Sequence, residues 1–388
     1  MPNKRIMHAH HQVKIKRDGG GSWVVGHGVQ STSYSANAQL EDVFVVGQLA
    51  AYQNIEGLPQ VEFTINKVLD GYPLIFCLAT GDATTPTISA RGNTKCLIAV
   101  DYFSDTLDSA TGSPLIHGEV SGAYPSSVQY SFPVDGNFTE QVTFAANNIV
   151  FANDPDMTQD DPWVLDAAPD GDFDSNNDAP LAVEGVNRRQ HIVFDVTATG
   201  VDINGMTADA DATILPPEVD GISTSGTNDI GADGYRNAHI QGLTVNCTLN
   251  REELLHLGQR GPYFRPIQYP IETTCEISTI ATSGRVPSMT EDGILTAPGN
   301  TDPCLFGGNL TNRTIRIATC EGTRIYLGTK NKLQSYNVSG GDAGSGNVQV
   351  SYTYSSKNHL TIIHSADQAA DVSGTAKWTN REDYLVET

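Results

Sequence analysis

The residues with the clearest potential for chemistry form an acidic run near the middle of the chain. Oxygen-bearing side chains occupy every second position, at Asp170, Asp172, Asp174, Asn176 and Asp178. This spacing suits a calcium-binding loop. The run lacks the glycine expected at the sixth position, and a leucine occupies the twelfth position, where an EF-hand has a bidentate glutamate. A calcium loop and a solvated acidic loop both stay open, and the composition favours the solvated loop.

Two other segments could bind ligands, but their contexts favour simpler interpretations. The glycine-rich residues 340–346 precede a strand pattern rather than a helix, so they predict a hairpin loop and not a phosphate cradle. His8, His10 and His11 lie in a basic N-terminal segment, which we expect to be a mobile arm rather than a metal site. Because no nucleophile elbow, zinc helix, dinucleotide fingerprint or Walker motif occurs, no catalytic or cofactor-binding residue is assigned.

The six cysteines carry no metal-binding or redox spacing, because no CxxC pair occurs. Most of them lie within apolar or alternating patterns, which favours small buried side chains that stay reduced. No apolar run is long enough to cross a bilayer. The basic N-terminus lacks the apolar core and the cleavage site of a signal peptide, so we expect the chain to fold in a cytoplasm.

The 388-residue chain has a formal net charge of −22 that is unevenly distributed. Residues 150–235 hold 18 Asp and Glu against two Arg, a net charge of −16. Such a chain does not hold nucleic acid by neutralising phosphates, since that mode requires Lys and Arg. It can still form a wall that repels DNA.

One block of sequence occurs twice, at a separation of 211 residues. Residues 41–59 and 252–270 share five identities in nineteen positions, where about one is expected from average residue usage. A second match pairs residues 142–144 with residues 350–352, at a separation of 208. A repeat of this length predicts two similar domains in tandem.

The repeat and the composition together predict five regions. They are a flexible basic arm (1–21), a first β domain (22–153), an acidic loop-rich connection or insertion (154–233), a second β domain (234–363) and a C-terminal arm (364–388). Short alternating apolar stretches indicate a mainly β fold. Each domain is expected to contain one short helix. In the second copy this helix begins at Asn250 and ends at Gly258, and in the first copy it ends at Gly47.

The second copy resembles the major tail tube proteins of tailed bacteriophages. The resemblance lies in residues 250–264, in the strand after Pro270, and in residues 327–341 with the tyrosine-rich strand that follows. Residues 44–71 look like the same unit. The resemblance implies two tandem β-sandwich domains of the tail tube type. It also implies rings that stack into a hollow tube in the virion tail, assembled in the host cytoplasm, through which DNA passes without specific binding. The implied partners are further copies of the chain and other tail proteins, namely the tape measure, the terminator and the tip.

Two domains per chain depart from the single domain of most family members. Three chains would therefore supply six domains in a ring with pseudo-sixfold symmetry, and six chains are the alternative. A structural role without enzymatic activity is the leading hypothesis. One competing hypothesis is a calcium-dependent β-sandwich binding module, namely a tail-tip, capsid-decorating or carbohydrate-binding protein. The other is an enzyme that acts on cell-wall glycans.

Overall fold

The computed structural model describes residues 8–18, 23–47, 49, 51–81, 88–103, 114–152, 186–189, 192–194, 240–258, 261–280, 315–319, 323–328, 330–340 and 347–364. Within these ranges the chain is mainly β, as the sequence predicts, with sixteen strands and two short α-helices, α1 (Ile75–Thr80) and α2 (Ile88–Arg91). A short 3₁₀ turn, η1 (His8–His10), precedes the first strand. None of the described helices is long and apolar enough to span a membrane.

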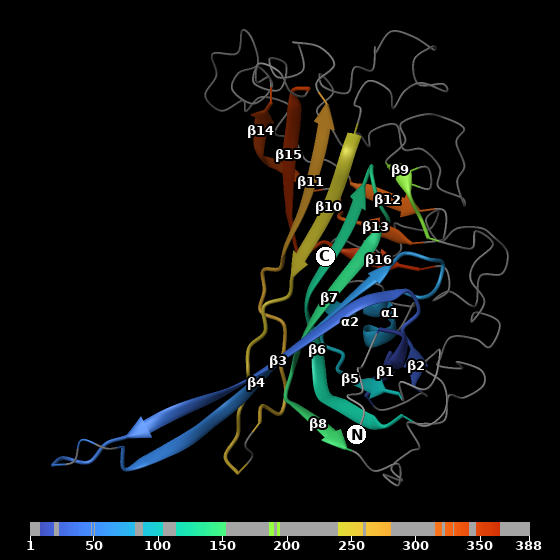
Figure 1. Cartoon of the computed structure of the whole chain (residues 1–388). Coiled ribbons are helices and arrows are strands. Elements are labelled where there is room, and N and C mark those ends of the chain that lie inside the picture. Colours follow the sequence, from blue (N-terminus) through green and yellow to red (C-terminus); the bar gives the residue numbers. More distant parts are fainter. Residues whose placement is uncertain are drawn as a thin grey trace, which may run out of the picture.

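The central feature is a continuous antiparallel sheet of eight strands, which we call the main sheet (Figure 1). Its strands in spatial order are β3 (Val29–Val43), β4 (Gln53–Val68), β7 (Thr139–Ala146), β6 (Ile116–Pro133), β10 (Ile240–Thr248), β11 (Glu272–Ile280), β15 (Gln349–Lys357) and β14 (Lys332–Ser339). Residues from both halves of the chain therefore share one sheet, and β6 pairs with β10 where they meet.

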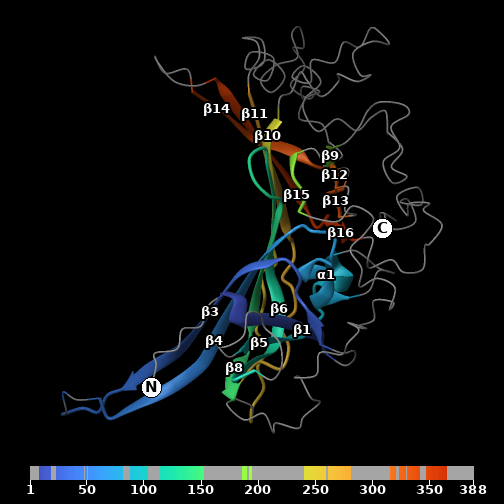
Figure 2. The same cartoon turned by 45° about the vertical axis from the view of Figure 1, so that its right-hand side comes forward.

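Two smaller groups of strands pack beside the main sheet. The N-terminal group has the order β2 (Val24–Val25), β1 (His11–Arg17), β5 (Cys96–Tyr102), the first part of β6, and β8 (Asn148–Ala152). The C-terminal group has the order β16 (Thr361–Ile363), β13 (Arg324–Tyr326), β12 (Arg316–Thr319) and β9 (Ile192–Phe194). Figure 2 shows both groups and α1 on one side of the main sheet, and the described elements leave most of its other face uncovered.

The order of strands is the same in the two halves of the main sheet. In the first half β3 pairs with β4, β4 with β7, and β7 with β6. In the second half β10 pairs with β11, β11 with β15, and β15 with β14. By order along the chain, β10, β11, β14 and β15 therefore correspond to β3, β4, β6 and β7.

The two halves also carry register shifts at corresponding places. Four pairs of strands each shift register by one residue, at Val29/Ser31 in β3, Ile240/Gly242 in β10, Pro125/Ser127 in β6 and Leu333/Ser335 in β14. Bulges interrupt pairing and bend a strand locally, so they mark defined positions in a sheet. Matching these positions aligns the two halves residue by residue.

This alignment corrects the register that the sequence suggests. Ser31 corresponds to Gly242, and their partners Asn66 and Ser278 are 212 residues apart, so the separation of 211 found for residues 41–59 increases to 212 within β4 and β11. A slip of one residue would exchange the two faces of a strand. The separation of 208 between β7 and β15 is wrong. The pairings with β4 and β11 place β15 at a separation of 210.

The hydrophobic core lies on the covered face of the main sheet. Large side chains that alternate along β4, β7, β11 and β15 are fully buried there, among them Phe63, Ile65, Phe144, Ile277 and Tyr352. Strict alternation places one set of residues on the core face and leaves the other set on the uncovered face. The core thus fixes which residues the uncovered face presents.

The short helix of the first half is α1, which the sequence pattern did not reveal. Its first turn has no side-chain cap of its own. The buried Glu140 of β7 accepts hydrogen bonds from the backbone N–H groups of Ile75 (2.7 Å) and Phe76 (3.2 Å) instead. Tyr130 of β6 donates to the same carboxylate at 2.8 Å. A residue distant in sequence therefore caps the helix and ties it to the main sheet.

The helix expected between Asn250 and Gly258 is wrong, as is its expected counterpart that ends at Gly47. Both segments are extended and fold back on themselves as hairpins. The leucines that suggested an apolar helical stripe have no core to face. Leu255 and Leu257 are exposed near a turn at Gly258, which has a φ of 93°.

The expected flexible arm of residues 1–21 is also partly wrong. His11–Arg17 form β1, which pairs with both β2 and β5, and the side chains of Val13 and Ile15 are buried. The acidic connection likewise contributes ordered structure, since β9 pairs with β12 and the side chain of Asn187 is buried. The C-terminal arm, 364–388, lies outside the described residues except for His364.

Candidate assembly interface

The main sheet has two edge strands, β3 and β14. Among the described strands, β3 pairs only with β4, and β14 pairs only with β15. Each strand therefore presents a row of backbone N–H and C=O groups that no described strand covers. Such an edge is a template for pairing with a strand of another molecule.

Side chains on the core face are only partly protected at these edges. Tyr34 of β3 is 45% exposed and Val338 of β14 is 41% exposed, whereas their counterparts Val245 and Tyr130 are each 1% exposed. Val245 and Tyr130 are buried because they face each other where β6 pairs with β10. A strand added next to β3 would bury Tyr34 in the same way, and a strand added next to β14 would bury Val338.

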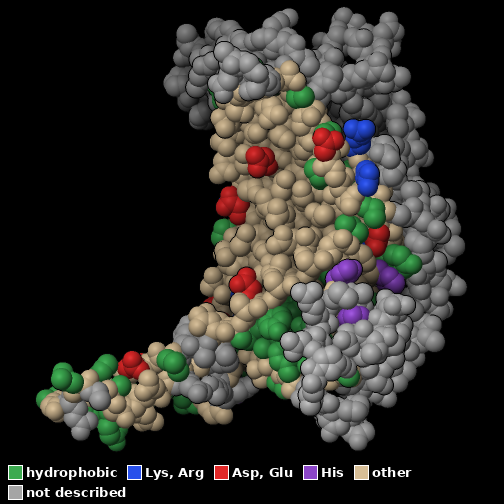
Figure 3. All heavy atoms as spheres, viewed as in Figure 1, with side chains coloured by type: hydrophobic (Ala, Val, Ile, Leu, Met, Phe, Trp, Pro, Cys, Tyr) green, Lys and Arg blue, Asp and Glu red, His purple; other side chains and the backbone are tan. Residues whose placement is uncertain are grey.

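The uncovered face of the main sheet is polar. Along the eight strands its side chains are mainly Ser, Thr, Asn and Gln, and its charged members include three glutamates and two lysines, Glu62, Glu272, Glu276, Lys332 and Lys357. Lys357 Nζ lies 2.8 Å from Glu272 Oε2, and this pairing lowers the pKa of the Glu272 carboxyl group. Figure 3 shows this surface as largely uncharged with isolated carboxylates. Its charge is therefore weakly negative.

Two hairpin arms extend from the main sheet, one from each half. The first arm comprises residues 40–56, at the distal ends of β3 and β4, and the second arm comprises residues 251–267. In Figure 1 the first arm projects far beyond the sheet at the lower left. The backbone pairs Leu40/Glu56 and Val43/Gln53 of the first arm correspond to Arg251/Ile267 and Leu254/Phe264 of the second. All four residues keep the separation of 211.

The two arms share their turn geometry and their exposed apolar positions. Gly47 and Gly258 have φ values of 96° and 93°, in the region where glycine avoids the steric cost of a side chain. The residue before each glycine is fully exposed, with Val46 at 103% and Leu257 at 101%. Both tips also expose a tyrosine and a second large apolar side chain. Such patches are typical of surfaces that contact another protein.

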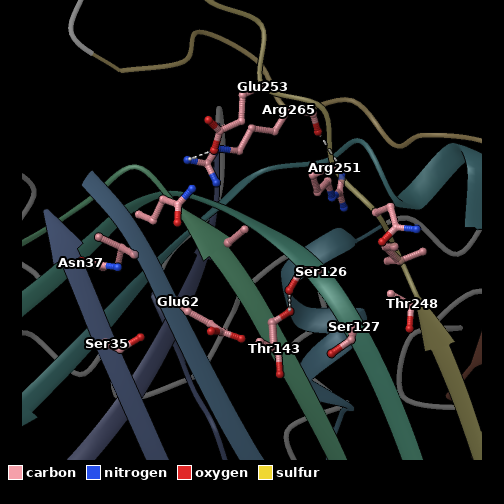
Figure 4. Close-up of a pocket in the computed structure, with 15 residues that line it drawn as sticks. Ser35, Asn37, Glu62, Ser126, Ser127, Thr143, Thr248, Arg251, Glu253 and Arg265 are labelled. Carbon is pink, nitrogen blue, oxygen red and sulfur yellow. Dashed lines mark hydrogen bonds and ion pairs between the residues drawn. The ribbon is translucent and has the colours of Figure 1, made fainter. Parts of the chain in front are cut away.

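The second arm is seated on the first half of the main sheet (Figure 4). Arg251 donates from Nε to the carbonyl oxygen of Pro125 at 2.9 Å, and its guanidinium lies 5.2 Å from the ring centroid of Tyr124. The Tyr124 ring also meets Phe264 edge to face at 6.1 Å. Asn147 donates to the carbonyl oxygen of Pro262 at 3.3 Å. Burial in this seat lowers the pKa of Arg251 to about 10.

A groove of about 580 Å³ lies between the bases of the two arms. Its floor is formed by polar residues of β3, β4, β6 and β7, and its wall by the ion pair between Arg265 Nη2 and Glu253 Oε1 at 3.1 Å (Figure 4). The corresponding position of the first arm holds a hydrogen bond from Asn54 to Asp42 at 2.7 Å. The same cross-strand polar pairing therefore braces both arms.

The candidate calcium residues Asp170, Asp172, Asp174, Asn176 and Asp178 all lie outside the described residues. Among the residues that the structure does describe, no three His, Cys, Asp or Glu side chains converge on a possible metal position. The segment after Gly340 connects β14 to β15, which are antiparallel neighbours, as the predicted hairpin requires. Cys77, Cys96, Cys247 and Cys275 are buried free thiols.

No protein-family model and no curated protein matches the chain. Solved structures do match it, at low similarity. The cap that terminates the tube of the anti-feeding prophage has 15% identity and a TM-score of 0.30, over 40% of this chain and 95% of that chain. A sheath–tube complex of an extracellular contractile injection system, PVC, has 15% identity and a TM-score of 0.26, over 39% and 95%.

The tail of a gene transfer agent particle has 8% identity and a TM-score of 0.23, over 32% of this chain and 83% of that chain. These matches come from tails or injection assemblies. Because the TM-scores are low, the function proposed below rests on features of the chain itself.

Proposed function

We propose that this chain is a structural subunit of a phage-type tail tube. Three copies form a closed ring, and the rings stack into a tube. The observation that carries the proposal is the junction at which β6 pairs with β10, because it joins two halves with the same strand order. In that order β14 corresponds to β6, and β3 corresponds to β10. The edge strand β14 of one chain can therefore pair with β3 of the next in the same way.

The matching strand order and the matching bulges support a tandem duplication of one domain, with the halves near residues 22–153 and 234–363. Three chains then supply six equivalent units, and head-to-tail pairing closes into a ring. Closure satisfies both open edges, which otherwise favour uncontrolled association.

The size of such a ring suits the passage of DNA. Eight strands from each of three chains give twenty-four strands. At a spacing of about 4.8 Å and a tilt of about 40°, they form a barrel with a backbone diameter of about 48 Å. Side chains that line the bore narrow it by about 10 Å. The remaining bore admits a DNA duplex.

The chemistry of the main sheet supports its orientation in the ring. The uncovered polar face would line the bore, while the smaller groups of strands would form the outer wall. The surface consists of hydroxyl and amide groups with a few carboxylates. Its strands present DNA with few cationic groups, namely Lys332 at the β14 edge and Lys357, which is paired with Glu272. DNA can therefore pass without specific binding. The exposed tips of the two arms would contact the adjacent ring or another tail protein at the end of the tube.

Negative-stain microscopy combined with mass photometry of the purified chain tests this proposal. We expect hollow rings or rods, and a smallest closed species with the mass of three chains. A particle that stays monomeric at tens of micromolar would overturn the proposal. A ring of six chains would retain the tube but reject the trimer.

A further inference from the structure

The seat of the second arm has a counterpart in the second half of the main sheet. Tyr124 and Pro125 lie at the bulge of β6, and Lys332 and Leu333 occupy the same places at the bulge of β14. The pairings agree with this correspondence. Tyr124 faces Ala145 of β7 and Lys332 faces Ser355 of β15, and these two partners are 210 residues apart, which is the separation between β7 and β15. No described residue of the first arm lies at Lys332 and Leu333 within the chain, because β3 and β14 are at opposite edges of the main sheet.

The first arm cannot reach this position within its own chain. The arm extends from β3, and the empty seat lies on β14, at the opposite edge of the main sheet. Seven spacings of about 4.8 Å separate the two edge strands, which amounts to about 34 Å. A first arm that docks on β14 as the second arm docks on β6 must therefore come from a second copy of the chain.

The chemistry of the first arm complements that of the empty seat. Leu40 takes the place of Arg251 and is 64% exposed, and it is followed by the exposed carboxylates of Glu41 and Asp42. The seat presents the exposed Lys332, whose aliphatic stem can cover Leu40 while its ammonium group approaches the two carboxylates. Lys357 is also exposed nearby at the end of β15. An apolar contact and an attraction between opposite charges thus replace the Arg251–Tyr124 stack.

We infer that the first arm of one chain docks on the start of β14 in a neighbouring copy, as the second arm docks on β6 within its own chain. The inference rests on the proposed ring, because only a neighbour joined at the β14 edge brings its own first arm to this position. Each ring interface then has two parts, a backbone pairing of β14 with β3 and a side-chain clasp that centres on Leu40 and Lys332.

A charge substitution in the arm tests the clasp. Leu40→Lys places a second ammonium group against Lys332, so we expect the dissociation constant of the ring to rise at least tenfold. Lys332→Ala removes the like charge, so its combination with Leu40→Lys should cost less than the sum of the two separate effects. The matched control is Val46→Lys, which adds the same charge at the tip of the same arm. It should leave the dissociation constant of the single ring unchanged, even where it weakens contacts between rings. Mass photometry over a dilution series measures the constant in each case.

The outcomes separate the clasp from the ring itself. If wild-type rings form and Leu40→Lys dissociates at the same concentration as wild type, the clasp is wrong and the ring stands. If the effects of Leu40→Lys and Lys332→Ala simply add, the proposed contact between these two residues is wrong. If the wild-type chain forms no ring at any concentration, the proposed function fails, and the clasp fails with it. Circular dichroism of each variant verifies that the monomer remains folded.

Discussion

At the residue scale, the most consequential side chain is Glu140, which is buried yet satisfied. It accepts from the first two N–H groups of α1 and from the Tyr130 hydroxyl group. Burial raises the pKa of its carboxyl group, and these donors together with Lys67 oppose the rise. Nothing in the sequence around residue 140 signals this role, because the helix that it caps begins 65 residues earlier.

We expect Glu140→Ala to lower the free energy of unfolding by about 2–3 kcal/mol, because it leaves three buried donors without their acceptor. Chemical denaturation followed by tryptophan fluorescence or circular dichroism measures the change. The control is Glu62→Ala on the uncovered face, which should change stability by no more than about 0.5 kcal/mol. Equal effects of the two substitutions would contradict the capping role.

The pH dependence provides a second measurement on the same pair of proteins. Because the pKa of Glu140 is raised in the folded state, the native protein binds this proton more tightly than the unfolded chain does. The contribution of Glu140 to stability should therefore increase as the pH falls through the folded-state pKa, and it should be complete below the unfolded-state value. Glu140→Ala loses this increase, whereas Glu62→Ala keeps it.

At the element scale, the sequence predicts some features well and others poorly. The mainly β fold and the block at a separation of 211 were visible, and the two arms keep that separation at Gly47 and Gly258. The helix expected at 250–258 was wrong because a run of leucines with capping residues looks the same whether it faces a core or an exposed tip. The predicted separation of 208 between β7 and β15 was wrong by two residues, because only the backbone pairing shows which residues face each other.

The open edges could not be predicted from the sequence either. Tyr34 and Val338 belong to ordinary alternating strands, and only the topology reveals that no described strand covers them. The fold therefore had to be known before an interface could be proposed. Once it is known, the internal β6–β10 pairing fixes the register expected between two chains. Gln129 faces Asn246 within the chain, and the corresponding residues are Asn337 of β14 and Ser35 of β3.

A disulfide between chains tests this register. Cysteines introduced at Ser35 and Asn337 should cross-link neighbouring copies under mild oxidation, in a background with serine at Cys304 and Cys320. The positive control is the pair Gln129→Cys and Asn246→Cys, which should cross-link within one chain. The negative control joins Ser31→Cys with Ser335→Cys, which the expected register places about 20 Å apart along the strands. Non-reducing gels separate the products, and stronger linkage in the negative control would refute the register.

At the scale of the whole molecule, the direction of the contact between chains decides what assembly forms. An interface that uses the same patch on both partners ends at a dimer, whereas β14 against β3 is head to tail and continues until a ring closes. The uncovered polar face and the two arms acquire a common role only if the ring closes. The two edges must therefore be different surfaces that each fit the other and not themselves.

Two edge-blocking substitutions distinguish head-to-tail pairing of β14 with β3 from pairing of two like edges. Ala36→Lys places an ammonium group on the core face of β3, and Val338→Lys does the same on β14, at positions that are exposed in the single chain. Each variant alone should remain monomeric, because every head-to-tail contact it can make includes one blocked edge. An equimolar mixture should form dimers and nothing larger, since the intact β14 of one variant can pair with the intact β3 of the other. Mass photometry reads both results directly. Dimers from a single variant would mean that like edges pair, and rings from the mixture would mean that neither edge forms the contact.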